Sequence, residues 1–512
     1  MILFSPALAG CVLLALAASY LWASLASPLR QVPGPWSSLF TSWILKWHEF
    51  RAQRTRYVHR LHLRYGPVVR IAPREVVFAS AEGVKEIYGS GGSGYDKTEF
   101  YDLFQCYGRR TMFSTLNKQD HAKRKRVLAD RYANTNVLRS GSLGGIQERS
   151  KRFVDRLSKS VGGSVDLFVS SPFSLPYTCL HDYAFDCVSH HLFHPYGSDS
   201  LRKEEDEKIM REVTFDDSLQ NRLLSYYNPW LHGVVENVLD FFWEPRETPL
   251  ADNLVLSATS KHDPLEFTLL SRMQDKNYDL EQLDMAAECT DHMAAGIDTT
   301  GDALCFLMWE ISQPRSLHIQ SRLQEEIRSA DLATTPFDKL PYLDAVVMEG
   351  LRCFPAIPMS LPRYAPAGGR TIDGYYIPGG TIVSAQAYST HRIDQRVFPE
   401  PELFNPDRWL DGLGDMDRKR LFFAFASGGE GVYWETVSVF FFFFFLSFPS
   451  FFAFLALAEM KTLLIDVYSR YSTRPDGSMT EGDMEMSDQL ISSQPRGKKC
   501  WMELVPLEEE TS

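Results

Sequence analysis

The sequence predicts a mainly α-helical fold with small β-sheets, preceded by a transmembrane helix at the N-terminus. Apolar residues recur at helical spacing over long segments between residues 119 and 330, which predicts a helix-dominated protein. Short alternating segments rich in valine and isoleucine lie near both ends and predict the small sheets. The first 29 residues carry no charged side chain, which predicts the transmembrane helix.

The N-terminal apolar segment, residues 1–29, is long enough to cross a bilayer, which takes about 20 apolar residues. A cleaved secretory signal is the alternative, because the small residues of "ASLAS" resemble a cleavage site. The segment has no basic start, however, and is longer than the apolar part of a usual signal. Basic residues from Arg30 onward indicate, by the positive-inside tendency, that the rest of the chain faces the cytoplasm. Residues 30–36, "RQVPGPW", are expected to be a stiff proline-rich linker.

Periodicity and alternation predict the elements beyond the linker. A basic amphipathic helix is expected over Trp47 to Tyr65, and two strands around Pro73 are expected within 67–80. A short helix follows and ends at Gly89, and paired glycines within 368–390 predict hairpins. Further helices are expected at 119–133, 145–160, 181–192, 202–242, 280–311, 316–330 and after 340. Because no repeat is evident and nothing indicates separately folding parts, residues 37–512 are expected to form one domain.

Composition argues against several classes of function. The net charge of −12 argues against a nucleic-acid partner held by a general basic surface, so any basic docking site must be local. The cysteines form no CxxC pair and have no regular spacing, which argues against a zinc ribbon or a disulfide framework. Reduced thiols in a cytosol-facing protein fit this pattern.

Small and polar residues interrupt an otherwise apolar predicted helix, Met293 to Ile311. Glycine and hydroxyl groups can loosen the helical hydrogen bonds there and admit water or a ligand. Asp298 beside Thr299 would supply a proton route. The alternative is a buried helix whose Ala295 and Gly296 accommodate a neighbour and whose Asp298 is solvated. Taken alone, this segment favours the alternative.

A more specific pattern follows in "VVMEGLRCFP" and "FNPDRW". Glu349 and Arg352 are three residues apart, hence on one face of a helix that Pro355 ends. Arg408 lies further on, in a loop braced by prolines. Two arginines around one carboxylate form a charge-assisted network that can hold a loop against a helix.

These stretches resemble the cytochrome P450 family of haem-thiolate monooxygenases, in its membrane-bound fungal form. The resemblance covers nearly the whole chain and rests on "PGPW", "YGPVVRIAP", "AGIDTT", "EGLR", "FNPDRW" and a late "QPRGKKC" hairpin, which are specific in combination. It implies the cytochrome P450 fold, a haem cofactor and oxidation of a lipophilic small molecule by O2. It also implies electrons from NADPH-cytochrome P450 reductase, location in the endoplasmic reticulum membrane, and a role in secondary metabolism.

The resemblance assigns roles to individual residues. Asp298 and Thr299 would relay protons, while Glu349, Arg352 and Arg408 would form the structural network under the haem. Haem contacts would come from four stretches: Ala295 and Gly296, Phe425 and Gly428, Arg363, and His121 with Arg124 or Lys125. The basic run Lys123 to Arg126, with Arg418 to Arg420, would receive the reductase, although such a run is usually a solvated face.

The loop that should present the haem ligand departs from the family pattern F-x-x-G-x-R-x-C-x-G. Phe425 and Gly428 match, but Glu430 stands at the arginine position, Val432 at the cysteine position and Trp434 at the later glycine position. Valine has no lone pair to offer a metal, so the sequence predicts no metal ligand in this loop. Cys305 and Cys353 are expected to be core residues rather than substitutes.

Residues 432–454 are an anomalous insertion, because family-like sequence resumes at Leu455. Val432 and Tyr433 require codons that resemble an intron donor, and the phenylalanine run at 440–445 requires a pyrimidine tract like that before an acceptor. We therefore expect that non-coding sequence is translated here and displaces a short cysteine-bearing exon or its reading frame. Two alternatives stay open: a second membrane span over 436–458, and a degenerate, haem-free relative whose insertion is genuine protein.

The sequence thus predicts a monooxygenase gene whose translation, as written, lacks the thiolate and is inactive. A non-catalytic membrane protein that retains the fold for binding is the alternative.

Overall fold

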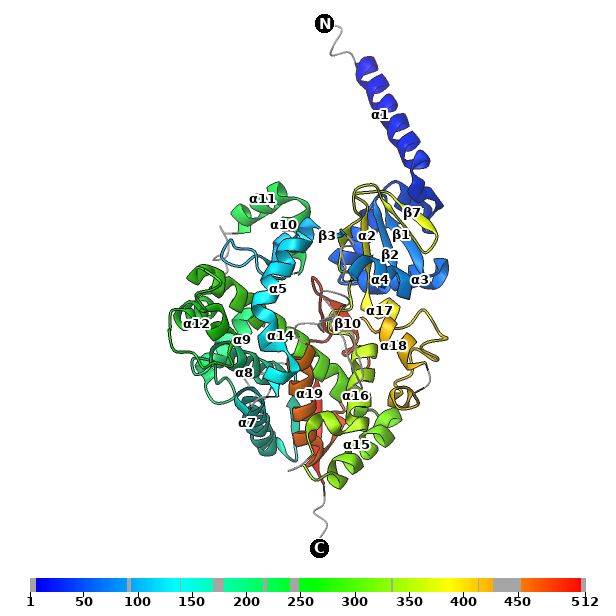
Figure 1. Ribbon diagram of the computed structural model, residues 1–512. Helices are drawn as coiled ribbons and strands as arrows, with labels where there is room; N and C mark the ends of the chain where they lie inside the picture. Colours follow the sequence, from blue (N-terminus) through cyan, green and yellow to red (C-terminus); the bar gives the residue numbers. More distant parts are fainter. Residues whose placement is uncertain are drawn as a thin grey trace, which may run out of the picture.

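The computed structural model describes residues 6–89, 94–138, 140–168, 179–214, 219–239, 248–332, 335–412, 414–426 and 453–507. Helices dominate this part of the chain and surround small sheets, as the sequence predicts (Figure 1). The helices are α1 Pro6–Ala26, α2 Trp43–Phe50, α3 Arg54–Tyr65, α4 Ala81–Tyr88, α5 Lys118–Tyr132, α6 Asn134–Val137, α7 Ser140–Leu157, α8 Leu180–Phe193, α9 Glu204–Thr214, α10 Leu219–Tyr227, α11 Pro229–Leu239, α12 Pro249–Thr259, α13 Leu269–Met273, α14 Gln282–Ile311, α15 Leu317–Ser329, α16 Pro341–Cys353, α17 Ala387–Thr390, α18 Asp415–Leu421 and α19 Ala453–Tyr468.

The strands form a five-stranded sheet, a three-stranded sheet and two hairpins within the described residues. In the largest sheet, of order β1-β2-β8-β5-β3, β2 pairs antiparallel with β1 and parallel with β8. The three-stranded sheet has the order β4-β12-β9, and the hairpins are β6-β7 and β10-β11. The strands are β1 Val68–Ala72, β2 Glu75–Phe78, β3 Asp96–Lys97, β4 Ser164–Asp166, β5 Arg363–Tyr364, β6 Arg370–Ile372, β7 Tyr375–Ile377, β8 Ile382–Ala385, β9 Tyr471–Pro475, β10 Met486–Asp488, β11 Ser493–Pro495 and β12 Trp501–Pro506.

Helix α1 projects from the folded body beside the sheet that contains β1 and β2 (Figure 1). Its segment Leu8–Ala26 is apolar, long enough to span a bilayer, and not buried against the rest of the protein. By length and composition, it is compatible with a single-pass membrane anchor. No other helix in the described part of the chain passes the same test.

Two predicted helices are divided in the structure. The helix expected over 47–65 breaks into α2 and α3, because Ala52 takes a left-handed conformation with φ of 53° and turns the chain. This turn directs the buried Arg54 to Glu75 on β2, at 2.7 Å. The periodic segment 202–242 contains α9, α10 and α11, and Pro229 begins α11 because proline cannot continue a preceding helix.

Pairing between strands also differs from the expected hairpins. The β6-β7 hairpin within 368–390 is confirmed, but β8 pairs with β2 and β5 instead of β7. The strands that flank "RGKKC" do not pair with each other, because β11 pairs with β10 while β12 lies between β4 and β9. These partners are distant in sequence, so local alternation carries no information about them.

Helix α14 runs through the middle of the body and packs along α8 (Figure 1). Their close approach depends on two glycines of α14. A Cβ on Gly296 would lie 2.7 Å from Val188, and one on Gly301 would lie 2.6 Å from the ring of His181. Both distances are too short for real atoms, so α8 is the neighbour that these glycines accommodate. This packing fixes the position of the polar residues between Gly296 and Gly301.

Candidate active site

A cavity of about 660 Å³ lies against the middle of α14. Its walls come from α5, α14, the β5 region, residues 423–426 and the start of α19. The cavity brings together the following residues that the sequence singles out: His121, Lys125, Ala295, Gly296, Asp298, Thr299, Arg363 and Phe425. Its volume is in the range of pockets that take small organic molecules.

The α14 wall of the cavity remains a continuous α-helix, so the local bulge that its glycine and hydroxyl groups suggested is not formed. The Thr299 hydroxyl donates a hydrogen bond to the carbonyl of Ala295, at 2.7 Å, and so returns to its own helix. Beside it, Oδ1 of Asp298 is buried and has no hydrogen-bond partner among the described residues. Burial, with a contribution from the neighbouring Asp302 carboxylate, raises the pKa of Asp298 to about 7. An acid that titrates near neutral pH is suited to proton transfer.

Basic side chains line the cavity from separate elements. His121 and Lys125 come from α5, and the buried Arg363 comes from β5. The sequence left Arg124 and Lys125 as alternatives, and the structure separates them. Lys125 lines the cavity, whereas Arg124 lies 3.3 Å from the Glu288 carboxylate on α14 and does not line it. The positive charges fit carboxylate groups on a bound molecule, such as the propionates of a porphyrin.

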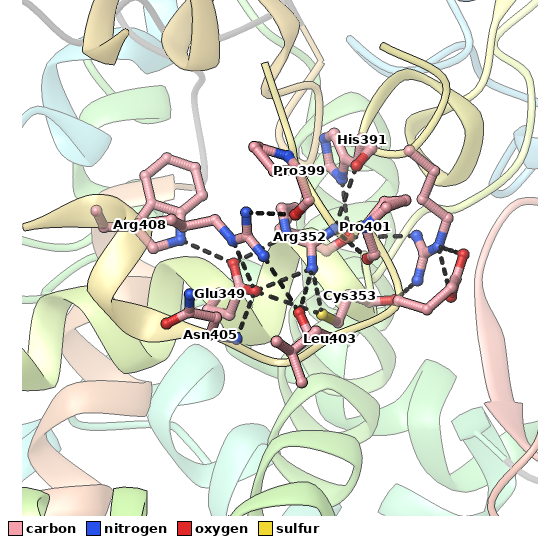
Figure 2. A network of polar contacts seen from close by, with 12 residues as sticks. Glu349, Arg352, Cys353, His391, Pro399, Pro401, Leu403, Asn405 and Arg408 are labelled. Carbon is pink, nitrogen blue, oxygen red and sulfur yellow. Dashed lines mark hydrogen bonds and ion pairs between the residues drawn. The ribbon is translucent and has the colours of Figure 1, made fainter. Parts of the chain in front are cut away.

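Glu349 and Arg352 on α16 meet the loop that carries Arg408, as Figure 2 shows. The Arg352 guanidinium donates to both carboxylate oxygens of Glu349, at 2.8 and 2.9 Å. Arg408 donates to the same carboxylate at 3.1 Å and to the carbonyl of Pro399 at 3.0 Å. Burial alone would raise the pKa of Glu349, but the two arginines outweigh it and lower that pKa. The network holds the loop against α16 and lies outside the cavity lining.

Two members of this network were missed by the sequence analysis. The indole of Trp409 donates to Glu349 at 2.9 Å. Both nitrogens of the His391 ring are hydrogen-bonded. Nδ1 lies 3.0 Å from the carbonyl oxygen of Arg352, and Nε2 accepts a hydrogen bond from the backbone N–H of Phe423 at 2.7 Å. His391 therefore connects α16 to the chain that enters the cavity wall at 423–426. It stands in a loop with no periodicity, so only the tertiary contacts identify it.

His391→Leu is expected to lower the free energy of unfolding by about 2–4 kcal/mol, because it leaves the buried N–H of Phe423 without its partner and leaves the Arg352 carbonyl with only a long contact, 3.5 Å from the Arg392 guanidinium. Urea unfolding at neutral pH measures the change. The matched control is His318→Leu at an exposed position on α15, for which we expect a change within about 0.5 kcal/mol. Equal stability of the two variants would contradict the connecting role of His391.

The described residues fit a porphyrin and its propionates but not a thiolate bond to iron. Phe423, Ala424 and Phe425 line the cavity, while Gly428 and Val432 lie outside the described residues, as does the insertion up to residue 452. The sequence contains no cysteine between Cys353 and Cys500. Cys106 is the cysteine found among the described cavity-lining residues, and burial raises its pKa to about 12, which keeps it a neutral thiol. No cluster of metal-ligating side chains occurs in the described part of the chain.

The basic residues proposed to receive a redox partner differ in exposure. Lys123 is well exposed on α5, next to Asp120 at 2.8 Å. Arg418 was expected at the surface, but it is buried, and its guanidinium lies 2.5 Å from the Asp411 carboxylate. Lys419 and Arg420 also have acidic partners, Asp415 and Asp417. Arg418 therefore cannot contribute to a docking patch. On α5, Arg124 contacts Glu288 and Lys125 lines the cavity, which leaves Lys123 and Arg126 as the exposed residues of the predicted surface.

Comparisons with known proteins identify the family. Residues 33–429 match the family model described as Cytochrome P450. The chain is similar to cytochrome P450 monooxygenase orf2 of Aspergillus niger, with 30% identity over 431 residues, covering 81% of this chain and 84% of that protein. It is also similar to cytochrome P450 monooxygenase stcB of Emericella nidulans, with 26% identity over 489 residues, 94% of this chain and 89% of that protein. Cytochrome P450 monooxygenase tazI of Aspergillus terreus is 28% identical over 413 residues, 76% of this chain and 80% of that protein.

Proposed function

Because the chain belongs to the cytochrome P450 family, we propose that its gene specifies a monooxygenase that inserts one atom of O2 into a lipophilic small molecule. Electrons would come from NADPH-cytochrome P450 reductase, and the product would belong to secondary metabolism. The similarity to fungal cytochrome P450 monooxygenases supports the reaction class. The apolar helix α1 supports attachment to the endoplasmic reticulum membrane, with the remaining chain in the cytoplasm.

The observation that carries the proposal is the cavity whose α14 wall presents Asp298 and Thr299. Haem bound there would supply the activation of O2 that the family uses. Lys125 and Arg363 would hold its propionates by charge, His121 would offer them a hydrogen bond, and Ala295 and Phe425 would contact the porphyrin. Asp298 would carry protons from the protein to the cavity, next to the Thr299 hydroxyl. Apolar lining at Met112, Leu361 and Leu455 would receive the lipophilic substrate.

We further propose that the polypeptide as written is inactive because its translation includes non-coding sequence at 432–454. The family match ends at residue 429, immediately before this segment. The absence of a cysteine between Cys353 and Cys500 supports the loss of the thiolate ligand. Sequencing the spliced transcript tests the cause. A message that encodes 432–454 unchanged would contradict it.

A second candidate function is binding without catalysis, in a degenerate member of the family. The missing cysteine favours it, because a chain that has lost the haem ligand still keeps the cavity and the Glu349 network. A transcript that encodes the insertion, together with a folded protein that binds lipophilic molecules but gives no turnover, would support this alternative.

The full chain as written is expected to give no thiolate-type Soret band in a reduced carbon monoxide difference spectrum, because the loop provides no cysteine. The spectrum is measured on protein expressed with haem precursor. A cytochrome P450 monooxygenase whose loop contains the cysteine is the positive control. A thiolate-type band from this chain would show that another cysteine binds the iron and would overturn the assignment of the lost ligand.

A further inference from the structure

A second acidic residue lies one helical turn beyond Asp298 on the cavity wall. Asp298 and Asp302 are four residues apart on α14 and therefore lie on the same face of the helix. Both line the cavity, and Asp302 is only 5% exposed. Two carboxyl groups this close influence each other strongly, because the protein interior screens charge poorly.

His181, on α8, pairs with Asp302. Its Nε2 lies 3.3 Å from Oδ1 of Asp302, and the imidazole is 1% exposed. The edge of the ring meets Phe168, with ring centroids 5.2 Å apart. The space for the ring exists because residue 301 is glycine, since a Cβ there would lie 2.6 Å from the imidazole. His181 is therefore fixed between α8 and α14, with Asp302 as its carboxylate partner.

Contact between His181 and Asp302 changes the pKa that burial alone would give each group. Burial would lower the pKa of His181, but its contacts with Cys179 and Asp302 outweigh burial and raise that pKa well above the ordinary value. Burial raises the pKa of Asp302, and His181 counteracts this. The pair can thus hold one shared proton at neutral pH without a net charge. Neither residue belongs to the acid and hydroxyl pair formed by Asp298 and Thr299.

Other ionisable groups share the cavity with Asp298 and contribute to its field. They come from the largest sheet, from residues 101–106 and from α5, α8, α9, α10, α12, α14 and α19: Lys97, Tyr101, Cys106, His121, Lys125, His181, Glu212, Arg222, Asp252, Asp291, Asp302, Arg363 and Glu459. Asp302 and His181 act on Asp298 in opposite directions, and Arg222 acts in the same direction as His181. Glu459 instead accepts a hydrogen bond from Thr300, at 3.3 Å. Among these groups, Asp302 is the carboxylate whose helical position is fixed relative to Asp298 by a single turn.

We propose that His181 and Asp302 are positioning residues for Asp298: their pair carries no net charge, but its carboxylate end lies one turn away on the same helix face and, partly balanced by the imidazole, sets the pH at which Asp298 gains and loses its proton. The inference rests on the proposed role of Asp298 and deepens it. A carboxyl group that carries protons must exist in both forms at the working pH. The pair provides this condition through the protein alone, before any haem or substrate binds.

The test follows the protonation of Asp298 in the purified full-length chain, by the infrared C=O stretch of its acid form. Asp298→Asn identifies the band by removing it. In Asp302→Asn, the repelling carboxylate is lost and His181 loses a partner that holds its proton. Because the Asp302 repulsion is the larger of these two effects on Asp298, we expect the titration midpoint of that band to shift to lower pH, by less than about one unit. Asp302→Glu keeps the carboxyl group and is expected to restore most of the original midpoint. Asp284→Asn, in the first turn of α14 and outside the cavity lining, is the control expected to leave the midpoint unchanged.

A purely structural pair would give a different result. Asp302→Asn would then lower the stability of the protein while the Asp298 band kept its midpoint, and this outcome would overturn the inference. An unshifted band in a variant of normal stability would do the same. The measurement needs no bound haem, so it is independent of the carbon monoxide spectrum that tests the proposed function.

Discussion

Glu349→Gln is expected to lower the free energy of unfolding by about 3–5 kcal/mol, because it leaves two buried guanidinium groups without their shared carboxylate. Glu349 and Arg352 are both fully buried, and Arg408 is 6% exposed. An amide can accept a hydrogen bond from one of them but carries no charge to balance either. Urea unfolding of the full chain in detergent at neutral pH measures the loss.

The matched control is Asp407→Asn in the neighbouring turn of the same loop. Its carboxylate pairs with Arg322 at 2.6 Å, but both side chains are at least half exposed, so we expect a loss of no more than about 1 kcal/mol. A similar small loss in Glu349→Gln would show that the buried network contributes no more than a surface pair. Protonation of Glu349 at low pH also removes its negative charge, so the pH dependence of stability gives a second comparison of the two variants.

The pH dependence follows from the lowered pKa of Glu349. The group binds its proton less readily in the folded protein than in the unfolded chain, where glutamate titrates at about pH 4.3. Its contribution to stability is therefore fully present above that pH and is lost as the pH falls through the lower folded value. Glu349→Gln should remove this part of the acid sensitivity, while Asp407→Asn should leave it.

Local patterns predicted the parts of this protein that depend on neighbours in sequence. The spacing of Glu349 and Arg352 places them on one helical face, and the structure joins them with Arg408 from a loop more than fifty residues away. His391 and Trp409 complete the same network, but their contribution depends on how the loop returns to α16. No spacing rule encodes that return. Charged motifs on one helix are therefore easier to predict than the uncharged residues that connect them.

The small residues of α14 show a second limit of sequence reasoning. The pattern correctly indicated that a neighbouring element approaches the helix at Gly296, but it could not identify that neighbour as α8, which places Val188 there. A glycine records only that space is needed, not what fills it. Similarly, adjacent residues on a helix point about 100° apart, so Arg124 meets Glu288 while Lys125 lines the cavity. Which of the two side chains lines the cavity depends on how α5 is rotated against α14, and the sequence of α5 alone does not give that rotation.

Replacing the insertion with a short cysteine-bearing loop is expected to create the thiolate-type Soret band that the chain as written lacks. The change combines Glu430→Arg, Val432→Cys and Trp434→Gly with removal of the residues that exceed the family length before Leu455. The described residues that flank the segment line the cavity, Phe425 and Ala426 before it and Leu455 and Ala456 after it. Because α19 begins at Ala453, the shorter loop has an existing helix to join.

The control is the same shortened loop with Val432→Ser, which keeps the backbone length and removes the thiol. This serine variant should fold equally well, but its carbon monoxide spectrum should lack the thiolate-type band, because a hydroxyl does not replace a thiolate as the donor to iron. The comparison separates loss of the ligand from loss of the fold. A cysteine loop that folds, takes up haem and still gives no thiolate signature would mean that the cavity walls no longer place residue 432 against the iron. Together with a spliced message that encodes 432–454 unchanged, that result would favour the degenerate, non-catalytic protein over a monooxygenase whose translation includes non-coding sequence.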